Sequence, residues 1–119
     1  MKQGKIWGFT TDFFRNMNVS VHHLSIKRGG YSSEHKHAHK SNLFYVISGE
    51  LEITIFREKD ITDKTILRAG DDSAIPSGYY HRFHALTDVE CIELYQIFLQ
   101  DPDIERRTHG GIDLNNNKK

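Results

Sequence analysis

Three histidines, His35, His37 and His39, alternate with other residues in the stretch "SSEHKHAHKSN". On an extended chain, alternate side chains share one face, and imidazoles two residues apart lie about 6 to 7 Å from each other. Histidine is the commonest metal ligand in proteins, so such a pair could share an ion. A further histidine, His81, follows a Gly-Asp turn and a Pro-x-Gly turn in "GDDSAIPSGYYH". This pattern favours a metal site over scattered surface histidines.

The segments that must position these histidines show a two-residue apolar period. Four of them are rich in Val, Ile, Phe and Tyr and predict long strands: 18–27, 42–48, 51–57 and 90–99. Shorter extended segments are expected at 5–9, 64–67, 73–75 and 81–85. The only helical feature that we expect is a single turn over 10–16. Many short strands separated by Gly, Pro, Asp and Ser turns indicate an all-β sandwich or barrel.

Length and composition narrow the class of protein. The 119 residues predict a single domain, 1–112, followed by a polar and disordered tail, 113–119. Sixteen basic and sixteen acidic residues cancel, which argues against nucleic acid or an anionic membrane as a partner. The single cysteine, Cys91, forbids an internal disulfide and suits a reducing compartment. With no apolar run long enough for a signal peptide or a membrane span, we expect a cytoplasmic protein.

Both histidine segments resemble the two motifs of the cupin superfamily. The first motif is matched by Gly29, five residues, His35-x-His37, four residues, Asn42, six residues and Gly49. The second is matched by Gly70, five residues, Pro76-x-Gly78, two residues and His81. The resemblance covers about residues 19–99 and implies a small, antiparallel jelly-roll β-barrel. It also implies that His35, His37 and His81 are metal ligands, with a fourth ligand position at residue 42.

Two positions depart from the cupin pattern: Asn42 replaces the usual glutamate, and Ala85 replaces a frequent asparagine. An amide offers only a neutral oxygen, so a bound ion would keep its double charge and favour a ligand that brings an anion. On that interpretation, Asn42→Glu should tighten metal binding about 10- to 100-fold and weaken anion binding. Alternatively, Asn42 only hydrogen-bonds a ligand histidine. His39 could replace Asn42 as a ligand or act as a general base, as could a tyrosine, but an exposed position or a contact with a ligand histidine is favoured for His39.

The alternation also predicts what lines the interior. A small and mostly apolar cavity is expected, lined by Phe44, Val46, Ser48, Phe83 and Ala85. Polar candidates beside it are Tyr45, Arg82, Glu93 and Tyr95. His84 should face outward, whereas His22 and His23 lie on opposite faces of their strand and either one could point inward.

The site predicts one divalent transition metal ion per chain (Fe, Mn, Ni or Zn) and a small anionic or polyhydroxylated ligand. The resemblance implies either a carbohydrate-type isomerase or epimerase, or dioxygenase chemistry at a three-histidine metal. The alternative is a non-catalytic module that binds metal or sugar. Residues 95–111 have a weaker similarity to sugar-phosphate isomerase-type cupins, but the favoured interpretation of this segment is a strand that leaves the barrel and crosses a partner subunit. Exposed edge strands further predict a homodimer, with 5–9 and 91–99 as the contributing segments.

Overall fold

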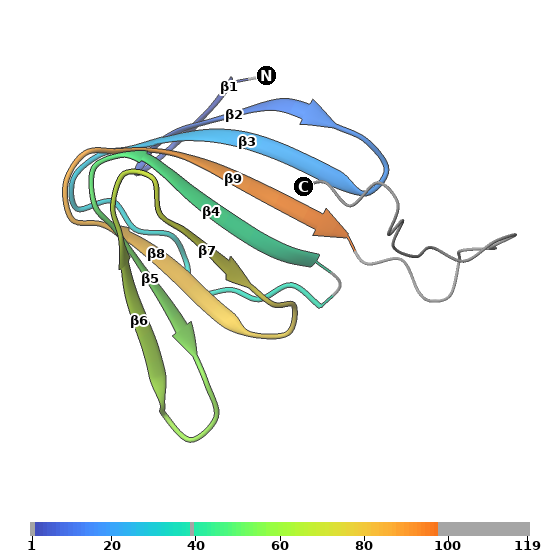
Figure 1. Cartoon of the computed structure of the whole chain (residues 1–119), viewed down its shortest axis with the longest axis vertical. Coiled ribbons are helices and arrows are strands. Elements are labelled where there is room, and N and C mark those ends of the chain that lie inside the picture. The colour runs from blue at the N-terminus through green and yellow to red at the C-terminus, as the bar shows by residue number, and fades with distance from the viewer. Residues whose placement is uncertain (1, 39, 98–119) are drawn as a thin grey trace, which may run out of the picture.

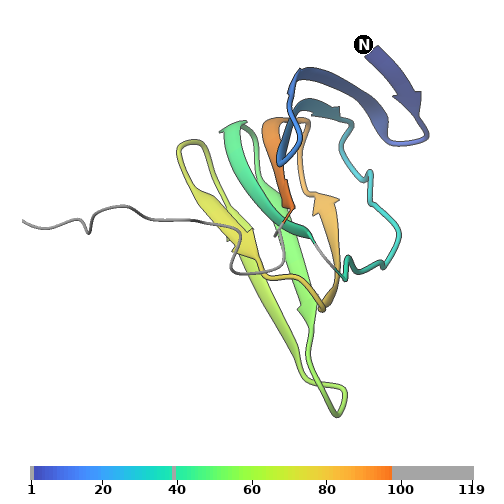
Figure 2. The same ribbon diagram turned by 90° about the vertical axis from the view of Figure 1, so that its right-hand side faces the viewer.

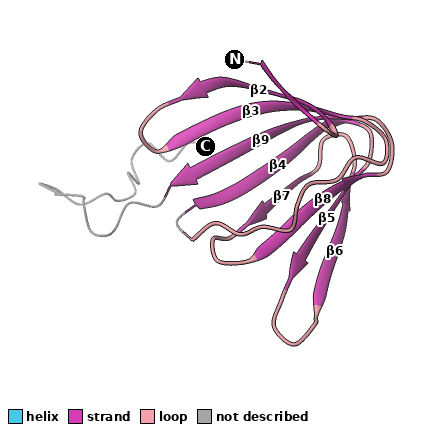
Figure 3. Ribbon diagram, turned by 180° about the vertical axis from the view of Figure 1, so that it is seen from behind, coloured by secondary structure: helices cyan, strands magenta, loops and turns pink. Residues whose placement is uncertain are grey.

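The computed structural model describes residues 2–38 and 40–97, and every regular element in this part of the chain is a β-strand (Figure 3). The strands are β1 (Lys2–Lys5), β2 (Gly8–Arg15), β3 (Val19–Ile26), β4 (Lys40–Ser48), β5 (Leu51–Phe56), β6 (Thr62–Leu67), β7 (Asp72–Ile75), β8 (Tyr80–Ala85) and β9 (Val89–Ile97). No helix of the described residues is long and apolar enough to cross a membrane.

The strands form two antiparallel sheets (Figure 1). The larger sheet has the order β1-β2-β3-β9-β4-β7, and the smaller one has the order β6-β5-β8. Apolar side chains from both sheets form one core, which includes Leu24, Phe44, Ile53 and Phe83. The expected all-β jelly roll is therefore confirmed, but as an open pair of sheets rather than a closed barrel.

The segment 10–16 does not form the expected helical turn. Its residues 10–15 lie in β2, which pairs with β1 on one side and with β3 on the other. Both sides of β2 thus find backbone hydrogen-bond partners, and such pairing outweighs a weak local preference. Figure 2 shows the β1–β2 hairpin at one extremity of the molecule.

Two expectations about sheet edges are also wrong. The segment 91–99 is not an edge strand, because β9 lies between β3 and β4. The segment 5–9 is not a strand of its own, because it contains the turn of the β1–β2 hairpin. The edges of the larger sheet are instead β1 and β7.

A register shift in β4 corrects the expected interior. Phe44 and Val46 are buried as expected, as are Phe83 and Ala85 on β8. Ser48 is exposed, because the pairing of β4 with β9 shifts between Val46 and Ser48. A bulge adds one residue to a strand and so reverses the face of those beyond it.

Several expectations fall outside the described residues. His39 is one of them, and residues 98–119 include the proposed domain end at 112, the tail and most of the segment 95–111. These expectations stay predictions.

Candidate metal centre

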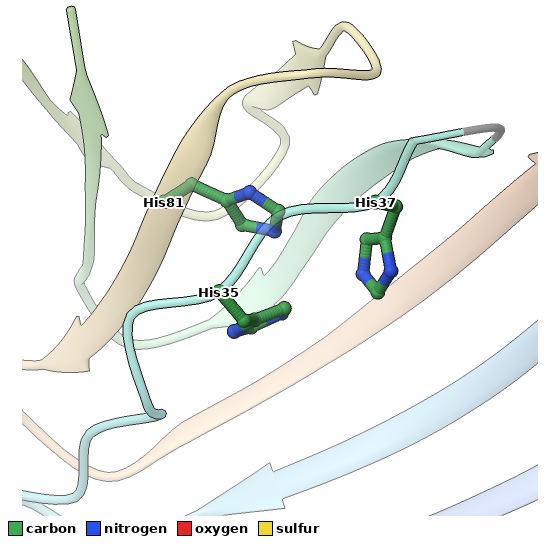
Figure 4. A group of neighbouring side chains, drawn as sticks. All are labelled: His35, His37 and His81. Atoms are coloured by element: carbon green, nitrogen blue, oxygen red, sulfur yellow. The ribbon is translucent and has the colours of Figure 1, made fainter.

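Three imidazoles meet between the loop before β4 and the start of β8 (Figure 4). His81 is the second residue of β8, whereas His35 and His37 lie in the loop that joins β3 to β4 and not on a strand as expected. One ligand atom from each histidine lies within 4.8 Å of the others. The His35 and His81 rings have the closest centroids, 4.4 Å apart. Small rotations of these side chains would bring the nitrogens to the spacing of ligands around one ion.

Backbone hydrogen bonds hold the loop against β8. The His35 N–H donates to the His81 carbonyl (3.1 Å), and the His81 N–H donates to the His35 carbonyl (2.8 Å). The Gly78 N–H donates to the His37 carbonyl (2.8 Å) from a backbone with φ of +91°, which glycine adopts without strain. The Pro-x-Gly turn therefore holds His37 through this hydrogen bond, and it leads directly into β8, which carries His81.

Backbone carbonyls set the tautomers of two of the rings. His81 Nδ1 lies 3.0 Å from the Tyr79 carbonyl, and His35 Nδ1 lies 2.8 Å from the Ser33 carbonyl. A carbonyl only accepts, so in the neutral rings Nδ1 carries the proton and Nε2 keeps its lone pair. Among the described residues, Nε2 of His37 and of His81 are buried without a hydrogen-bond partner. Such lone pairs fit a divalent cation.

The cluster also favours neutral imidazoles. Burial lowers the pKa of His37 to about 4, and the neighbouring His35, His81 and Lys40 add to the effect. Burial likewise lowers the pKa of His81. Metal binding requires the deprotonated ring, so at neutral pH these histidines already have the ligating form.

Asn42, which replaces the usual glutamate of the motif, hydrogen-bonds an acidic side chain. It lies opposite Tyr95 in the pairing of β4 with β9, and its Nδ2 donates to Glu93 Oε2 at 2.9 Å. In the described part of the chain, the Oδ1 atom of Asn42 is buried and has no hydrogen-bond partner. The carboxylate that the sequence motif lacks at position 42 is thus present on the adjacent strand.

Glu93 is almost completely buried, with 7% of its surface exposed. Burial raises its pKa to about 7, although hydrogen bonds from Tyr95 and Asn42 favour the charged form. Burial and the nearby Glu93 carboxylate also raise the pKa of Tyr95. The sequence named Glu93 only as a polar candidate; its contact with Asn42 could not be read without the strand register.

A pH-dependent stability follows from Glu93. Its pKa is about 7 in the folded protein and ordinarily 4.5, so between these values the folded state binds more protons than the unfolded chain. The free energy of unfolding should therefore fall as the pH rises from 4.5 to 7, by on the order of 3 kcal/mol. Glu93→Gln should abolish this fall. Urea unfolding of metal-free protein at pH 5 and pH 8 measures it.

The parent and the variant must be compared at each pH, because His37 and His81 have lowered pKa values and shift stability in the opposite direction below pH 6.5. That contribution is common to both proteins and cancels in the difference. Parallel pH profiles for parent and variant would show that the pKa of Glu93 is not raised.

A pocket of about 500 Å³ opens beside the cluster and reaches it at His35. Its lining residues are Gln3, Lys5, Trp7, Thr10, Asp12, Arg15, His22, Ser32, Ser33, His35, Phe83, Glu93 and Tyr95. Most of these residues are polar or charged, and of the five side chains predicted to line the interior only Phe83 lines this pocket. The β1–β2 hairpin is the reason, because it extends the sheet beyond the predicted strands and adds its own polar side chains.

The structure also places the other sequence candidates. His22 points inward and hydrogen-bonds Ser20 (2.6 Å), whereas His23 faces the other side of the sheet and lies 3.0 Å from Glu90. His84 faces away from the cluster, with Nδ1 4.0 Å from Glu52. Tyr45 is exposed and does not line the pocket.

Solved structures with the same fold include proteins that differ widely in sequence. The chain is similar to KdgF from Halomonas sp., with 21% identity and a TM-score of 0.67 over 78% of this chain and 81% of that one. It is similar to Bacillus subtilis oxalate decarboxylase, a protein with Mn(II) centres, with 21% identity and a TM-score of 0.73 over 86% of this chain but 29% of that one. A protein of unknown function from Streptococcus pyogenes has 16% identity and a TM-score of 0.65 over 76% and 74%.

At these identities the likeness shows the fold and not an activity. No curated protein matches the chain significantly. The family model for the cupin domain matches residues 22–95, which is more than half of the chain and includes the three clustered histidines. The chain therefore belongs to the cupin family.

Proposed function

We propose that this cupin binds one divalent transition metal ion through His35, His37 and His81, and that a small anionic or polyhydroxylated molecule binds in the adjoining pocket. The observation that carries the proposal is the convergence of the three rings beside a pocket with polar and charged side chains, two of the rings having a buried Nε2 without a partner in the described chain. Mn(II) centres in the structurally similar oxalate decarboxylase support a metal of this class.

The pocket lining supports an anionic ligand with hydroxyl groups. Lys5 and Arg15 contribute positive charge, but Arg15 is already paired with Asp12 at 2.7 Å. Lys5 is therefore the cation best placed to meet a ligand carboxylate. In the same pocket, the Glu93 carboxylate and the Tyr95 oxygen, whose hydrogen is already donated to Glu93, offer acceptors for ligand hydroxyl groups.

Catalysis would use the same residues. A bound divalent ion acts as a Lewis acid that polarises a carbonyl oxygen. A buried carboxylate that lines a pocket and has a pKa near 7 can take up or release a proton at neutral pH. This favours a proton-transferring isomerase or epimerase, with Glu93 in place of His39 as the candidate base. A purely binding module is the alternative outcome.

Calorimetric titration of metal-loaded protein tests the ligand class. We expect a sugar acid such as galacturonate to bind more tightly than galactose, and Lys5→Gln to weaken galacturonate binding about 5- to 20-fold while changing galactose little. Lys64→Gln is the matched control, because Lys64 is an exposed lysine on β6, outside the pocket. Equal affinities for the two sugars, or equal effects of the two variants, would contradict an anion subsite at Lys5.

A test for turnover distinguishes a proton-transferring enzyme from a module that only binds its ligand. If a bound sugar acid exchanges a carbon-bound proton with solvent deuterium in the parent but not in Glu93→Gln, the site is catalytic. Binding without exchange in either protein would make the cupin a binding module.

A further inference from the structure

A second pocket, of about 620 Å³, opens between the turn of the β1–β2 hairpin and the loop that follows β3. These two segments are neighbours (Figure 2), because the pairing of β2 with β3 places the turn beside the end of β3. The second pocket is lined by the cations Lys5, Lys27 and Arg28, and none of its described lining residues is acidic. The first pocket, which reaches His35, includes two acids. The second pocket thus concentrates positive charge in a chain whose net charge is zero.

Two of these cations have no acidic partner. Within the part of the chain that the structure describes, no ion pair joins an acid to the Lys27 ammonium or the Arg28 guanidinium. Asp88 approaches this loop, but it accepts a hydrogen bond from the Arg28 backbone N–H (2.9 Å). Lys5 is shared, because it also lines the first pocket and interacts electrostatically with Glu93 there. Like charges in one pocket repel one another, so an anion that binds among them relieves this repulsion.

Backbone hydrogen bonds order the loop of the second pocket before any ligand arrives. The Lys27 N–H donates to the Trp7 carbonyl of the hairpin turn (2.8 Å). The Gly29 N–H donates to the Ala85 carbonyl, and the Ala85 N–H donates to the Gly30 carbonyl, both at 2.8 Å. Gly30 permits the close contact with the turn, because a Cβ there would lie 2.7 Å from the Trp7 Cβ. A site whose backbone is already ordered loses less entropy on binding.

Apolar side chains form the walls of the second pocket. Tyr31 is 63% exposed, Ile6 is fully exposed, and the half-buried Trp7 lines the same pocket. The Tyr31 ring packs edge-on near His84 and lies 5.8 Å from the Arg82 guanidinium carbon, yet most of its surface remains open. Exposed aromatic rings beside cations suit a ligand that combines a flat ring with an anionic group.

From this arrangement we propose that the second pocket binds a small phosphate monoester that carries a planar aromatic ring. The phosphate has nearly two negative charges at neutral pH, so it can meet Lys27 and Arg28 together, and a guanidinium can bind two of its oxygens at once. The ring lies against Tyr31. A single carboxylate would leave one of the two cations unpaired. The volume of the pocket is in the range of small-molecule sites.

This site requires neither a bound metal nor the sugar acid of the proposed function. Lys27 and Arg28 line the second pocket and not the first. Failure of either proposal therefore leaves the other intact.

Titration of the full chain with phenyl phosphate tests the charge contacts, with the fluorescence of Trp7, the only tryptophan, as the signal. We expect Lys27→Gln and Arg28→Gln each to raise the dissociation constant about 5- to 20-fold. Both side chains are exposed, so the variants should fold as the parent does, which thermal unfolding checks. Lys64→Gln is the matched control, because Lys64 is exposed on β6 and lines neither pocket. This variant should change the affinity by less than about twofold.

A second comparison tests the contact with the aromatic ring. Cyclohexyl phosphate has the same charge and a similar size but no aromatic face, and we expect it to bind about 3- to 10-fold more weakly than phenyl phosphate. Tyr31→Leu should remove most of this preference and leave the affinity for inorganic phosphate unchanged within about twofold. An undiminished preference in Tyr31→Leu would overturn the placement of the ring.

Three other outcomes would overturn the proposal altogether. The first is a parent chain that shows no saturable binding of phenyl phosphate. The second is binding that is insensitive to Lys27→Gln and Arg28→Gln but is lost in His81→Ala, which would place the phosphate at the histidine cluster. The third is an oligothymidine strand that binds more tightly than phenyl phosphate and is lost in the Lys27 and Arg28 variants, which would make this surface a contact for nucleic acid.

Discussion

His81→Ala is expected to lower the affinity for a divalent transition ion more than about a hundredfold. Changes to residues that only support a metal ligand already cost 10- to 100-fold, and His81 is itself a proposed ligand. Its Nε2 is buried, has no protein partner in the described chain, and lies in a group that holds only two other imidazoles. Elemental analysis of purified protein and competition with a chelating indicator measure the loss.

His84→Ala is the matched control. It removes the same side chain from the same strand, but on the face that points away from the cluster. Because His81→Ala also leaves a void in a buried site, His37→Ala provides a second variant at a half-buried position. Metal content equal to that of the parent in both His37→Ala and His81→Ala would refute the assignment.

Asn42→Glu is expected to destabilise the metal-free protein by on the order of 3 kcal/mol at pH 8, and not to give the tighter metal binding that the sequence motif suggests. The Asn42 amide donates to Glu93, so the substitution replaces a donor with a second carboxylate in a buried site. Repulsion between two adjacent carboxylates raises the pKa of one of them, so one of the two should stay protonated to a higher pH. The single variant should therefore gain little metal affinity.

Asn42→Glu combined with Glu93→Gln is the decisive comparison. This double variant exchanges the acid and the amide and keeps the total charge of the site. It should regain the stability of the parent and bind metal about 10- to 100-fold more tightly, as expected when a carboxylate replaces an amide near an ion. Ser48→Glu, at the exposed end of β4, controls for the added charge. A stable single variant would show that positions 42 and 93 do not act as a pair.

The sequence predicted the fold and the three clustered histidines well, because both follow from local patterns. Period-two alternation identified β3, β4, β5 and β9, although it missed the eight-residue β2, and the motif spacing placed His81 after a turn whose Gly78 hydrogen-bonds His37. Neither prediction required knowledge of which strands are neighbours.

Features that depend on strand neighbours were missed. The contact of Asn42 with Glu93 joins residues 51 positions apart, and it exists only because β9 lies beside β4. The same holds for the pocket lining, because a helical turn was expected where β2 pairs with β1 and β3. The exposure of Ser48 depends on a bulge that alternation does not reveal.

The four-residue strand β1 has a consequence for how the pocket beside the three histidines can be measured. It contributes Gln3 and Lys5 to the pocket, yet as an edge strand it pairs only with β2. Strands with few partners open at a lower free-energy cost than central ones. A ligand held by Lys5 should therefore slow hydrogen exchange of the β1 backbone amides, so that a short edge strand reports on occupancy of the pocket.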